Sequence, residues 1–268
     1  MTDVIRLEYR NVTMRFGEGA GQLTAIRDVS FAIRDREVVS LIGPSGCGKS
    51  TLLNIGSGLY PPSEGAAFVD GVEVAGPNSH VAFMLQKDLL LPWRTVTENV
   101  TLGVEIQGVA APERRQRARG LLEGFHLAEF AGHYPHQLSG GMRQRVALAR
   151  TLAVDPSVLL LDEPFSAVDA QTRIALQRDL AQTLKRAGKT ALLITHDLME
   201  AVMLSDRVLV MSRRPGHIID EIAIDLPHRD DPILRGRNTR AGDYVARLMD
   251  LLDIGHAPLS EPVAEGVA

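Results

Sequence analysis

The chain has 268 residues, of which 45% are hydrophobic and 23% charged, and its formal net charge is −4. This composition is typical of a globular protein with one large or two modest domains, and it offers no net basic field that would favour nucleic acid as a partner. Cys47 is the only cysteine, which excludes an internal disulfide and fits a reducing compartment. No apolar run approaches about 18 residues, so we expect neither a signal peptide nor a membrane-spanning helix.

The first part of the chain has an alternating apolar pattern. Every second residue is apolar in the segments 5–9 and 29–33. A period of two predicts half-buried β-strands. Farther along, Asp70-Gly71 joins the apolar run 67–69 to the alternating segment Val72-Glu73-Val74, which is a strong hairpin signal. We therefore expect an antiparallel β portion at the front of the chain.

From about residue 88 to residue 155 the pattern becomes helical. The segment 114–122 is basic and helical, and apolar residues such as Met142 and Val146 recur at helical spacing behind Ser139. Serine is a favoured residue at the position that caps a helix N-terminus. This stretch therefore predicts a helical insertion in which one helix begins just after Ser139.

The rest of the chain alternates short apolar runs with helical segments. The runs 158–161, 191–194 and 208–211 are wholly apolar, and 38–42 is a similar run earlier in the chain. Strands that are apolar on both faces and separated by helices predict a parallel sheet covered on both sides, hence an α/β nucleotide-binding core. We expect one domain at 1–230, with its helical subdomain at about 88–155, and a C-terminal helical or tail extension at 231–268.

A glycine-rich loop follows the apolar run 38–42 and precedes a helical run. Its sequence is Gly43-Pro44-Ser45-Gly46-Cys47-Gly48-Lys49-Ser50, which matches G-x-x-x-x-G-K-[ST]. Backbone N–H groups of such a loop cradle phosphate oxygens, and the following helix N-terminus adds partial positive charge. Lys49 then neutralises the β- and γ-phosphates, and the Ser50 hydroxyl can bind Mg²⁺. A chance match has a frequency on the order of 1% in a chain of this length.

Two acidic residues follow the run 158–161. Asp162, at the end of a buried strand beside the glycine loop, can hold the Mg²⁺ shell. Glu163 is then placed to act as a general base on an attacking water. Two acids after a strand are equally often a solvated loop, and it is the glycine loop that gives the pair its functional interpretation.

A third motif distinguishes this chain from other P-loop proteins. Leu138-Ser139-Gly140-Gly141-Met142 opens a basic helix roughly ninety residues after the glycine loop, an arrangement that a plain P-loop kinase or GTPase does not explain. Together the three motifs resemble those of an ABC transporter ATPase, with Walker A at 43–50, the signature at 138–142 and Walker B through Asp162 and Glu163. The resemblance covers residues 9 to about 226 and implies a P-loop NTPase (RecA-like) core with a helical signature subdomain.

The resemblance assigns roles to residues in this sequence. It implies that ATP contacts Phe16, the loop from Gly43 through Thr51, Ser139, Gly140, Gly141 and Asp169. It implies that Mg²⁺ is held by Ser50, Gln86 and Asp162, and that catalysis uses Glu163, His196 and Gln86.

The individual assignments rest on position. Gln86 matches the Q-loop at a strand end, His196 matches the switch histidine, and 166–169 matches the D-loop that packs across a dimer. Phe16 stands where the family has an aromatic residue that stacks on adenine, and it could otherwise be an ordinary core residue. Met142 departs from the glutamine common in the family, so the partner's γ-phosphate should be held by Ser139 and the N–H groups of Gly140 and Gly141.

The resemblance also implies partners. The signature serine serves the ATP site of a second copy, so two chains should hold two ATP molecules head to tail. An ATPase chain without membrane helices is the bacterial importer arrangement, in which permease subunits and a periplasmic or lipid-anchored solute-binding protein complete the system. The expected location is peripheral, on the cytoplasmic face of the inner membrane.

Two stretches, 90–100 and 212–227, look like the nitrate/sulfonate/taurine importer subfamily. The second could equally be a plain hairpin with a Pro-Gly turn. Trp93 and the leucines before it could form either the permease docking surface or local core. A soluble ABC ATPase that acts as a switch is the alternative function, although such proteins usually carry two ATPase halves. Nitrate, taurine, alkanesulfonates, bicarbonate or a pyrimidine precursor are all compatible as cargo.

Overall fold

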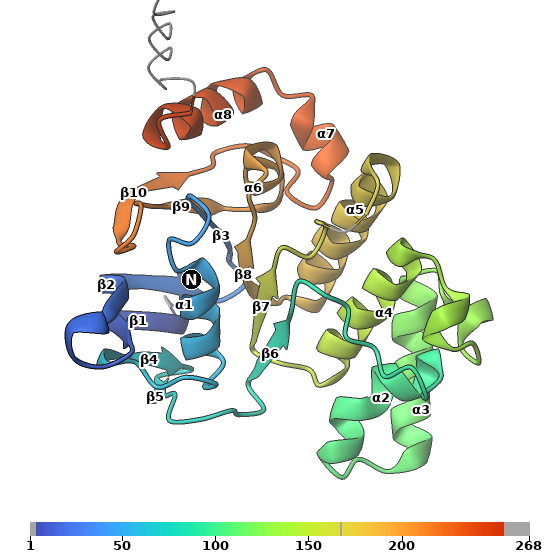
Figure 1. Cartoon of the computed structure of the whole chain (residues 1–268). Coiled ribbons are helices and arrows are strands. Elements are labelled where there is room, and N and C mark those ends of the chain that lie inside the picture. Colours follow the sequence, from blue (N-terminus) through green and yellow to red (C-terminus); the bar gives the residue numbers. More distant parts are fainter. Residues whose placement is uncertain (1–3, 167, 255–268) are drawn as a thin grey trace, which may run out of the picture.

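Two β-sheets organise the molecule (Figure 1), and the computed structural model describes residues 4–166 and 168–254. The larger sheet has the strand order β10-β9-β3-β8-β7-β6, and the smaller has the order β2-β1-β4-β5. In the larger sheet the strands from β9 to β6 are parallel, and β10 is antiparallel to β9. The strands are β1 (Ile5–Phe16), β2 (Leu23–Arg34), β3 (Val38–Ile42), β4 (Glu64–Val69), β5 (Val72–Glu73), β6 (Val81–Met84), β7 (Val158–Asp162), β8 (Thr190–Ile194), β9 (Arg207–Met211) and β10 (Ile218–Ala223).

The parallel sheet places five strand ends along one edge. Strands β3 and β8 are buried along their whole length, as expected for strands covered on both faces. Because β9, β3, β8, β7 and β6 run in the same direction and are neighbours in that order, the segments that follow them emerge at the same edge. The predicted α/β fold with a mostly parallel sheet is confirmed.

The antiparallel sheet packs against the first helix. Strand β1 pairs with β2 and β4, and the predicted hairpin at Asp70-Gly71 joins β4 to β5. Helix α1 (Lys49–Gly56) contributes to the core beneath this sheet, where Leu7 and Tyr9 share a buried cluster with Leu52 and Leu53. The Tyr9 hydroxyl donates a hydrogen bond to the Leu52 carbonyl (2.8 Å), which satisfies its buried polar end.

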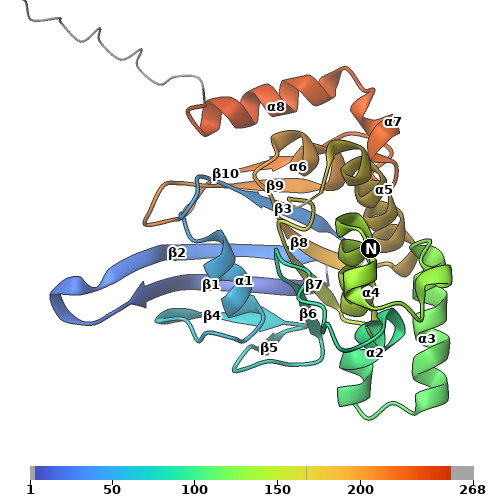
Figure 2. The ribbon, with the colours of Figure 1, turned by 45° about the vertical axis from the view of Figure 1, so that its right-hand side comes forward.

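A lobe of helices stands beside the parallel sheet (Figure 2). Its helices are α2 (Val96–Ile106), α3 (Ala111–Gly124) and α4 (Gly140–Ala153). Thr95 and Glu98 form a reciprocal capping box at the start of α2, and Ser139 caps α4 as the sequence predicts. Helix α4 also reaches β6, so the lobe shares a hydrophobic core with the sheet.

Four further α-helices lie in the described residues of the second half of the chain. They are α5 (Ala170–Ala187), α6 (Leu198–Leu204), α7 (Pro232–Gly236) and α8 (Arg240–Leu251). Helix α8 packs on α6 and helix α7 contacts α5 and α6, so the predicted extension begins with two docked helices. The rest of that extension, 255–268, lies outside the described residues, and the boundary at residue 230 stays a prediction. No helix in the described part of the chain is long and apolar enough to cross a bilayer.

Candidate functional site

A cleft of about 290 Å³ opens where the two sheets meet at the carboxyl edge of the parallel strands. Its lining comes from β1, β2, the glycine loop with the start of α1, and the carboxyl ends of β7, β8 and β9 with the segments that follow them. The residues that line it are Phe16, Leu23, Ala25, Ser45, Gly46, Gly48, Lys49, Ser50, Thr51, Glu163, Ile194 and Arg214. Phe16, most of the predicted 43–51 loop and Glu163 are thus brought together in one place.

The glycine loop joins β3 to α1 in the conformation that the motif requires. Gly48 has φ +108° and sits immediately before the first residue of α1. A Cβ atom at this position would collide with the Ile26 side chain, so both backbone conformation and space favour glycine. The loop therefore presents a helix N-terminus to the cleft, where partial positive charge and free N–H groups can receive phosphate.

Lys49 supplies a cation inside the loop. Its Nζ donates hydrogen bonds to the carbonyls of Gly43 (2.7 Å) and Pro44 (3.0 Å), and the side chain is buried. Cys47 is buried as well, with its Sγ 3.8 Å from the same Nζ. A buried ammonium held by two neutral carbonyls has no anionic partner among these bonds, which leaves its charge available to a phosphate.

Asp162 lies within hydrogen-bond distance of the Ser50 hydroxyl, and Ser50 lines the cleft whereas Asp162 does not. Burial raises the pKa of Asp162 above its usual range, and the charge of Glu163 adds to that rise, whereas the Ser50 hydroxyl and Lys49 oppose it. A carboxylate whose ionised form is disfavoured by burial gains from a nearby cation. The pair offers a carboxylate and a hydroxyl oxygen, and Mg²⁺ commonly binds one or two protein oxygens of this kind together with substrate phosphates. The donor set therefore fits Mg²⁺.

Two of the predicted catalytic residues converge on a carboxylate oxygen of the third, Glu163. Gln86 Nε2 donates a hydrogen bond to Glu163 Oε2 (2.9 Å), and His196 Nδ1 lies 3.3 Å from the same oxygen. Glu163 has φ +47°, an uncommon conformation for a non-glycine residue that is concentrated at functional sites. Its backbone N–H donates to the Ile194 carbonyl (3.0 Å), which ties the end of β7 to the end of β8.

Phe16 forms one wall of the cleft. It is the last residue of β1, it is 39% exposed, and its ring faces Tyr60 edge to face at 6.3 Å between ring centroids. The interpretation as an ordinary core residue is therefore wrong for Phe16. An exposed ring at the rim, beside Leu23 and Ala25, is available to stack on a planar base.

The signature residues do not line this cleft. Ser139 and Gly140 are exposed at the start of α4, and Ser139 Oγ accepts a hydrogen bond from Met142 N (3.3 Å). Gly140 lines a separate hollow with Gln86, Arg143 and Ser166. Within one chain, the signature therefore presents an open helix N-terminus to solvent.

The predicted D-loop residue Asp169 has a local structural role. Its carboxylate caps α5 by accepting hydrogen bonds from the N–H groups of Gln171 (3.1 Å) and Thr172 (3.0 Å). These bonds, led by the one from Thr172, lower the pKa of Asp169 below its usual range. It does not line the cleft. Ala167, in the same predicted loop, lies outside the described residues.

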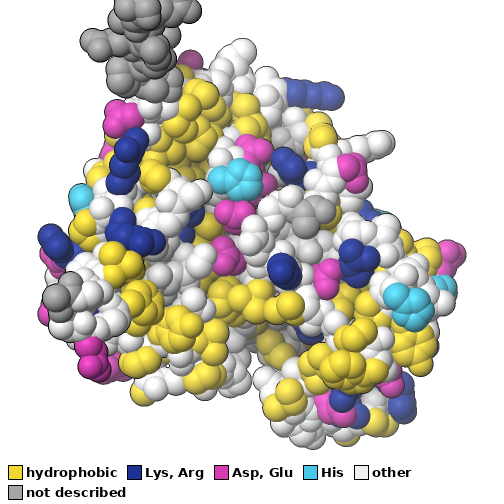
Figure 3. Space-filling view, in the orientation of Figure 1, with side chains coloured by type: hydrophobic (Ala, Val, Ile, Leu, Met, Phe, Trp, Pro, Cys, Tyr) yellow, Lys and Arg dark blue, Asp and Glu magenta, His cyan; other side chains and the backbone are white. Residues whose placement is uncertain are grey.

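The exposure of Trp93 tests its interpretation as local core. This residue is 71% exposed and Leu89 is 52% exposed, whereas Leu90 is buried in the core shared by the helical lobe and the sheet. The local-core interpretation is therefore wrong for Trp93. Figure 3 shows hydrophobic side chains on both sides of the hollow between the helical lobe and the rest of the molecule.

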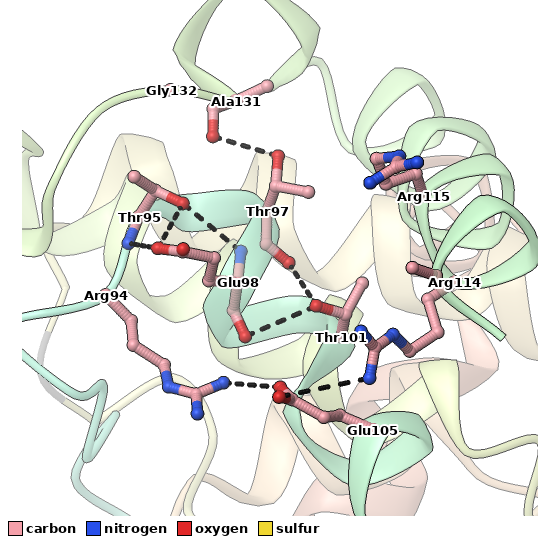
Figure 4. Close-up of a pocket in the computed structure, with 11 residues that line it drawn as sticks. Arg94, Thr95, Thr97, Glu98, Thr101, Glu105, Arg114, Arg115, Ala131 and Gly132 are labelled. Atoms are coloured by element: carbon pink, nitrogen blue, oxygen red, sulfur yellow. Dashed lines mark hydrogen bonds and ion pairs between the residues drawn. The ribbon is translucent and has the colours of Figure 1, made fainter. Parts of the chain in front are cut away.

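A larger hollow of about 570 Å³ lies on the helical lobe, away from the glycine loop (Figure 4). There Arg94 and Arg114 approach Glu105 from two sides, at 2.6 and 3.9 Å. We take the smaller cleft as the nucleotide site because the phosphate loop and the predicted catalytic carboxylate line it, whereas the larger hollow contains neither.

Sequence reasoning missed Arg214. This residue lies in the turn between β9 and β10 and lines the cleft. From the sequence, the turn can be interpreted either as a feature of the importer subfamily or as a plain hairpin. The sequence did contain a signal that could have found Arg214. The turn follows the apolar run 208–211, and in a parallel sheet the end of such a strand lies at the same edge as the glycine loop.

Comparison with known proteins decides the family. The family model described as "ABC transporter" matches residues 26–166, more than half of the chain. This chain belongs to the ABC transporter family. The taurine import ATP-binding protein TauB of Burkholderia pseudomallei is 46% identical over 82% of this chain and 85% of its own length. An uncharacterized ABC transporter ATP-binding protein of Methanocaldococcus jannaschii is 44% identical over 85% of each chain.

A solved structure agrees with these relatives. The post-hydrolysis dimer of the ATP-binding cassette MJ0796, bound to ADP and phosphate, superimposes with a TM-score of 0.72 at 33% identity, covering 81% of this chain and 98% of that one. The predicted ABC ATP-binding subunit of the nitrate/sulfonate/taurine subfamily is confirmed, as are the importer ATPase function and nucleotide binding. The soluble switch is not favoured.

Proposed function

We propose that this chain drives import of a small solute through a separate permease by hydrolysing ATP in the cleft beside the glycine loop. The observation that carries the proposal is the convergence of Gln86 and His196 on Glu163, next to a phosphate loop. A carboxylate oxygen approached by two hydrogen-bonding side chains is held in one orientation, as a general base requires.

The chemistry follows from the positions of these groups. The loop N–H groups and Lys49 bind the phosphates, and Phe16 stacks on the adenine. Ser50, Asp162 and Gln86 would hold Mg²⁺, which supplies charge neutralisation for the phosphates when bound. Glu163 takes a proton from water as the water oxygen attacks the γ-phosphorus, and the bond to the β–γ bridging oxygen breaks to give ADP and phosphate. His196 orients the water and the γ-phosphate.

Two copies of the chain complete each site. Ser139 and Gly140 are exposed and do not line their own chain's cleft, which is the arrangement expected of groups that serve a neighbouring nucleotide. In the sandwich, the open N-terminus of α4 would meet the γ-phosphate bound by the second copy. The solved MJ0796 cassette is dimeric, and we extend that assembly to this chain.

The permease should dock on the helical lobe beside the Q-loop. Leu89 and Trp93 are large apolar residues left exposed on the segment that follows Gln86. A patch of this kind, rimmed by charges such as Arg94, is typical of a protein interface. Closure of the ATP dimer would then move the permease. In this proposal the chain lies on the cytoplasmic face of the membrane, and a periplasmic or lipid-anchored binding protein delivers the solute from the other side.

We infer that the solute belongs to the nitrate, sulfonate and taurine group. We place taurine first because TauB of Burkholderia pseudomallei, a taurine import ATP-binding protein, is 46% identical to this chain.

The test is uptake of labelled taurine, an alkanesulfonate and nitrate in a strain that lacks this gene. Complementation by the wild-type gene should restore uptake of one of them, and complementation by Glu163→Gln should not. Equal uptake with both genes would refute the coupling of hydrolysis to import.

A further inference from the structure

Arg214 is a second cation at the nucleotide cleft, contributed by a part of the chain remote from the glycine loop. It lies in the turn between Met211, the end of β9, and Ile218, the start of β10. Strand β9 pairs in parallel with β3, whose own carboxyl end leads into the glycine loop. The topology therefore places the two turns side by side, and Arg214 lines the cleft together with Phe16 and Lys49.

The turn is held firmly against the glycine loop. The Gly216 N–H donates to the Ala25 carbonyl (2.9 Å), and the Arg27 N–H donates to the Gly216 carbonyl (2.9 Å), so the turn is bonded twice to β2. A Cβ atom at Gly216 would collide with the Cys47 carbonyl. Backbone packing thus fixes the start of the Arg214 side chain at the rim of the loop.

The guanidinium reaches the loop itself. Its Nε and Nη2 both donate to the Gly46 carbonyl, at 2.9 and 2.7 Å. None of the acidic residues in the described part of the chain forms an ion pair with it. Arginine has five N–H donors, so the contact with one neutral carbonyl leaves donors and the full charge free at the cleft. The adjacent Arg213 is exposed and does not line the cleft.

We propose that Arg214 binds the phosphates of a nucleoside di- or triphosphate directly, as a binding residue supplied by the β9–β10 turn. This inference rests on the nucleotide occupying the cleft proposed above. A planar guanidinium suits phosphate oxygens and keeps its charge at any physiological pH. Lys49 bonds to Gly43 and Pro44, and Arg214 bonds to Gly46, so the two cations reach the loop at different points.

A competing role must be separated from this one. Arg214 could act only as a clamp that holds the Gly46 carbonyl, without touching the nucleotide. Glutamine at this position can still donate a hydrogen bond but has no charge, whereas lysine keeps the charge and loses the planar fork. Arg213→Gln removes the same charge one residue away and serves as the matched control.

The experiment measures dissociation constants for ATP and for ADP by equilibrium titration of the full chain at low and high salt. For Arg214→Gln we expect both affinities to fall roughly 5- to 20-fold at low salt, as for one charge-assisted contact at a partly exposed site. The loss should shrink at high salt. Arg214→Lys should lose less affinity than Arg214→Gln, because it keeps the charge but not the planar fork, and Arg213→Gln should match the wild type.

Two results would overturn the inference. One is wild-type affinity in Arg214→Gln. The other is an equal loss in Arg214→Gln and Arg214→Lys that does not respond to salt, which would assign Arg214 to the clamp.

Melting temperatures without nucleotide identify a variant that is misfolded. Lys49→Ala in the same titration separates the two proposals: retained binding there would refute the cleft itself, whereas lost binding there with wild-type affinity in Arg214→Gln would refute only the role of Arg214.

Discussion

The two regions that contribute to ATP hydrolysis differ in how completely one chain assembles them. The phosphate-loop half is the cleft with the glycine loop and Glu163, and the signature half is the start of α4. In the first half, Gln86 and His196 both reach Glu163, and Lys49 is buried in its loop. In the second half, Ser139 Oγ is bonded to its own helix and otherwise faces solvent. The first half is assembled by strands that end at one edge of a sheet, whereas the second is an exposed helix N-terminus. The difference supports the proposal that a second copy of the chain completes each ATP site.

The largest expected effect comes from breaking the assembled half. Glu163→Gln preserves side-chain size and removes the base, so the ATPase rate should fall by about 100- to 10,000-fold while ATP still binds. Because hydrolysis normally reopens the sandwich, the variant should accumulate as a dimer with Mg-ATP and return to monomer with ADP. Light scattering after size exclusion measures this. Hydrolysis at the wild-type rate would mean that another group is the base.

The next effect comes from breaking the signature half alone. Ser139→Arg should leave ATP binding to the isolated chain within about 2-fold of the wild type, because Ser139 does not line its own cleft. Turnover should fall by about 100-fold, since the arginine would clash with the neighbour's nucleotide. Combined with Glu163→Gln, it should abolish the ATP-dependent dimer. Loss of ATP binding by the monomeric variant would place Ser139 in its own chain's site and remove the distinction between the halves.

A moderate effect is expected on the docking surface, which lies between the two halves in the sequence. Trp93→Ala should change the free energy of unfolding by less than about 0.5 kcal/mol, because the residue is 71% exposed. Basal ATPase of the isolated chain should persist, and stimulation by the permease should be lost. Leu90→Ala is the matched control: this neighbour is buried, and its loss should cost about 2–4 kcal/mol in denaturant unfolding. Equal destabilisation by both substitutions would contradict the docking assignment.

The last prediction concerns stability and not turnover, and its subject is a buried carboxyl group near the catalytic residues. Glu200, on the helix that follows His196, accepts a hydrogen bond from Gln177 Nε2 (3.1 Å), and burial raises its pKa to about 7. The folded state then holds a proton that the unfolded state releases, so stability should decline as pH rises from about 4.5 to about 7. Glu200→Gln should lack this decline, which is on the order of 3 kcal/mol.

Urea unfolding at pH 5 and pH 8 measures the effect. Glu73→Gln, a substitution on the exposed strand β5, is the control and should follow the wild type. Parallel pH curves for the wild type and Glu200→Gln would show that Glu200 is ionised in the folded protein at pH 5.

Much of the fold and of the candidate site follows from local patterns. Apolar runs of four or five residues predict the buried parallel strands, and the Asp70-Gly71 hairpin and the Ser139 cap follow from the residues that form them. The 43–51 loop could be predicted because its phosphate-binding groups are contiguous and owe their positions to the backbone of one turn. The role of Glu163 follows from its place after a buried strand beside that loop, whereas His196 acquires its role only through the family resemblance, since its distance along the sequence carries no geometric information.

Only the tertiary structure decided which of these groups meet. Gln86, Glu163 and His196 follow β6, β7 and β8, and they come together because those strands are neighbours in a parallel sheet. Arg214 reaches the glycine loop for the same reason, since β9 lies beside β3. Burial separated Leu90 from Trp93 within one apolar run. Local residue preferences act over a few positions, whereas strand order and exposure depend on contacts between segments that are distant in the sequence.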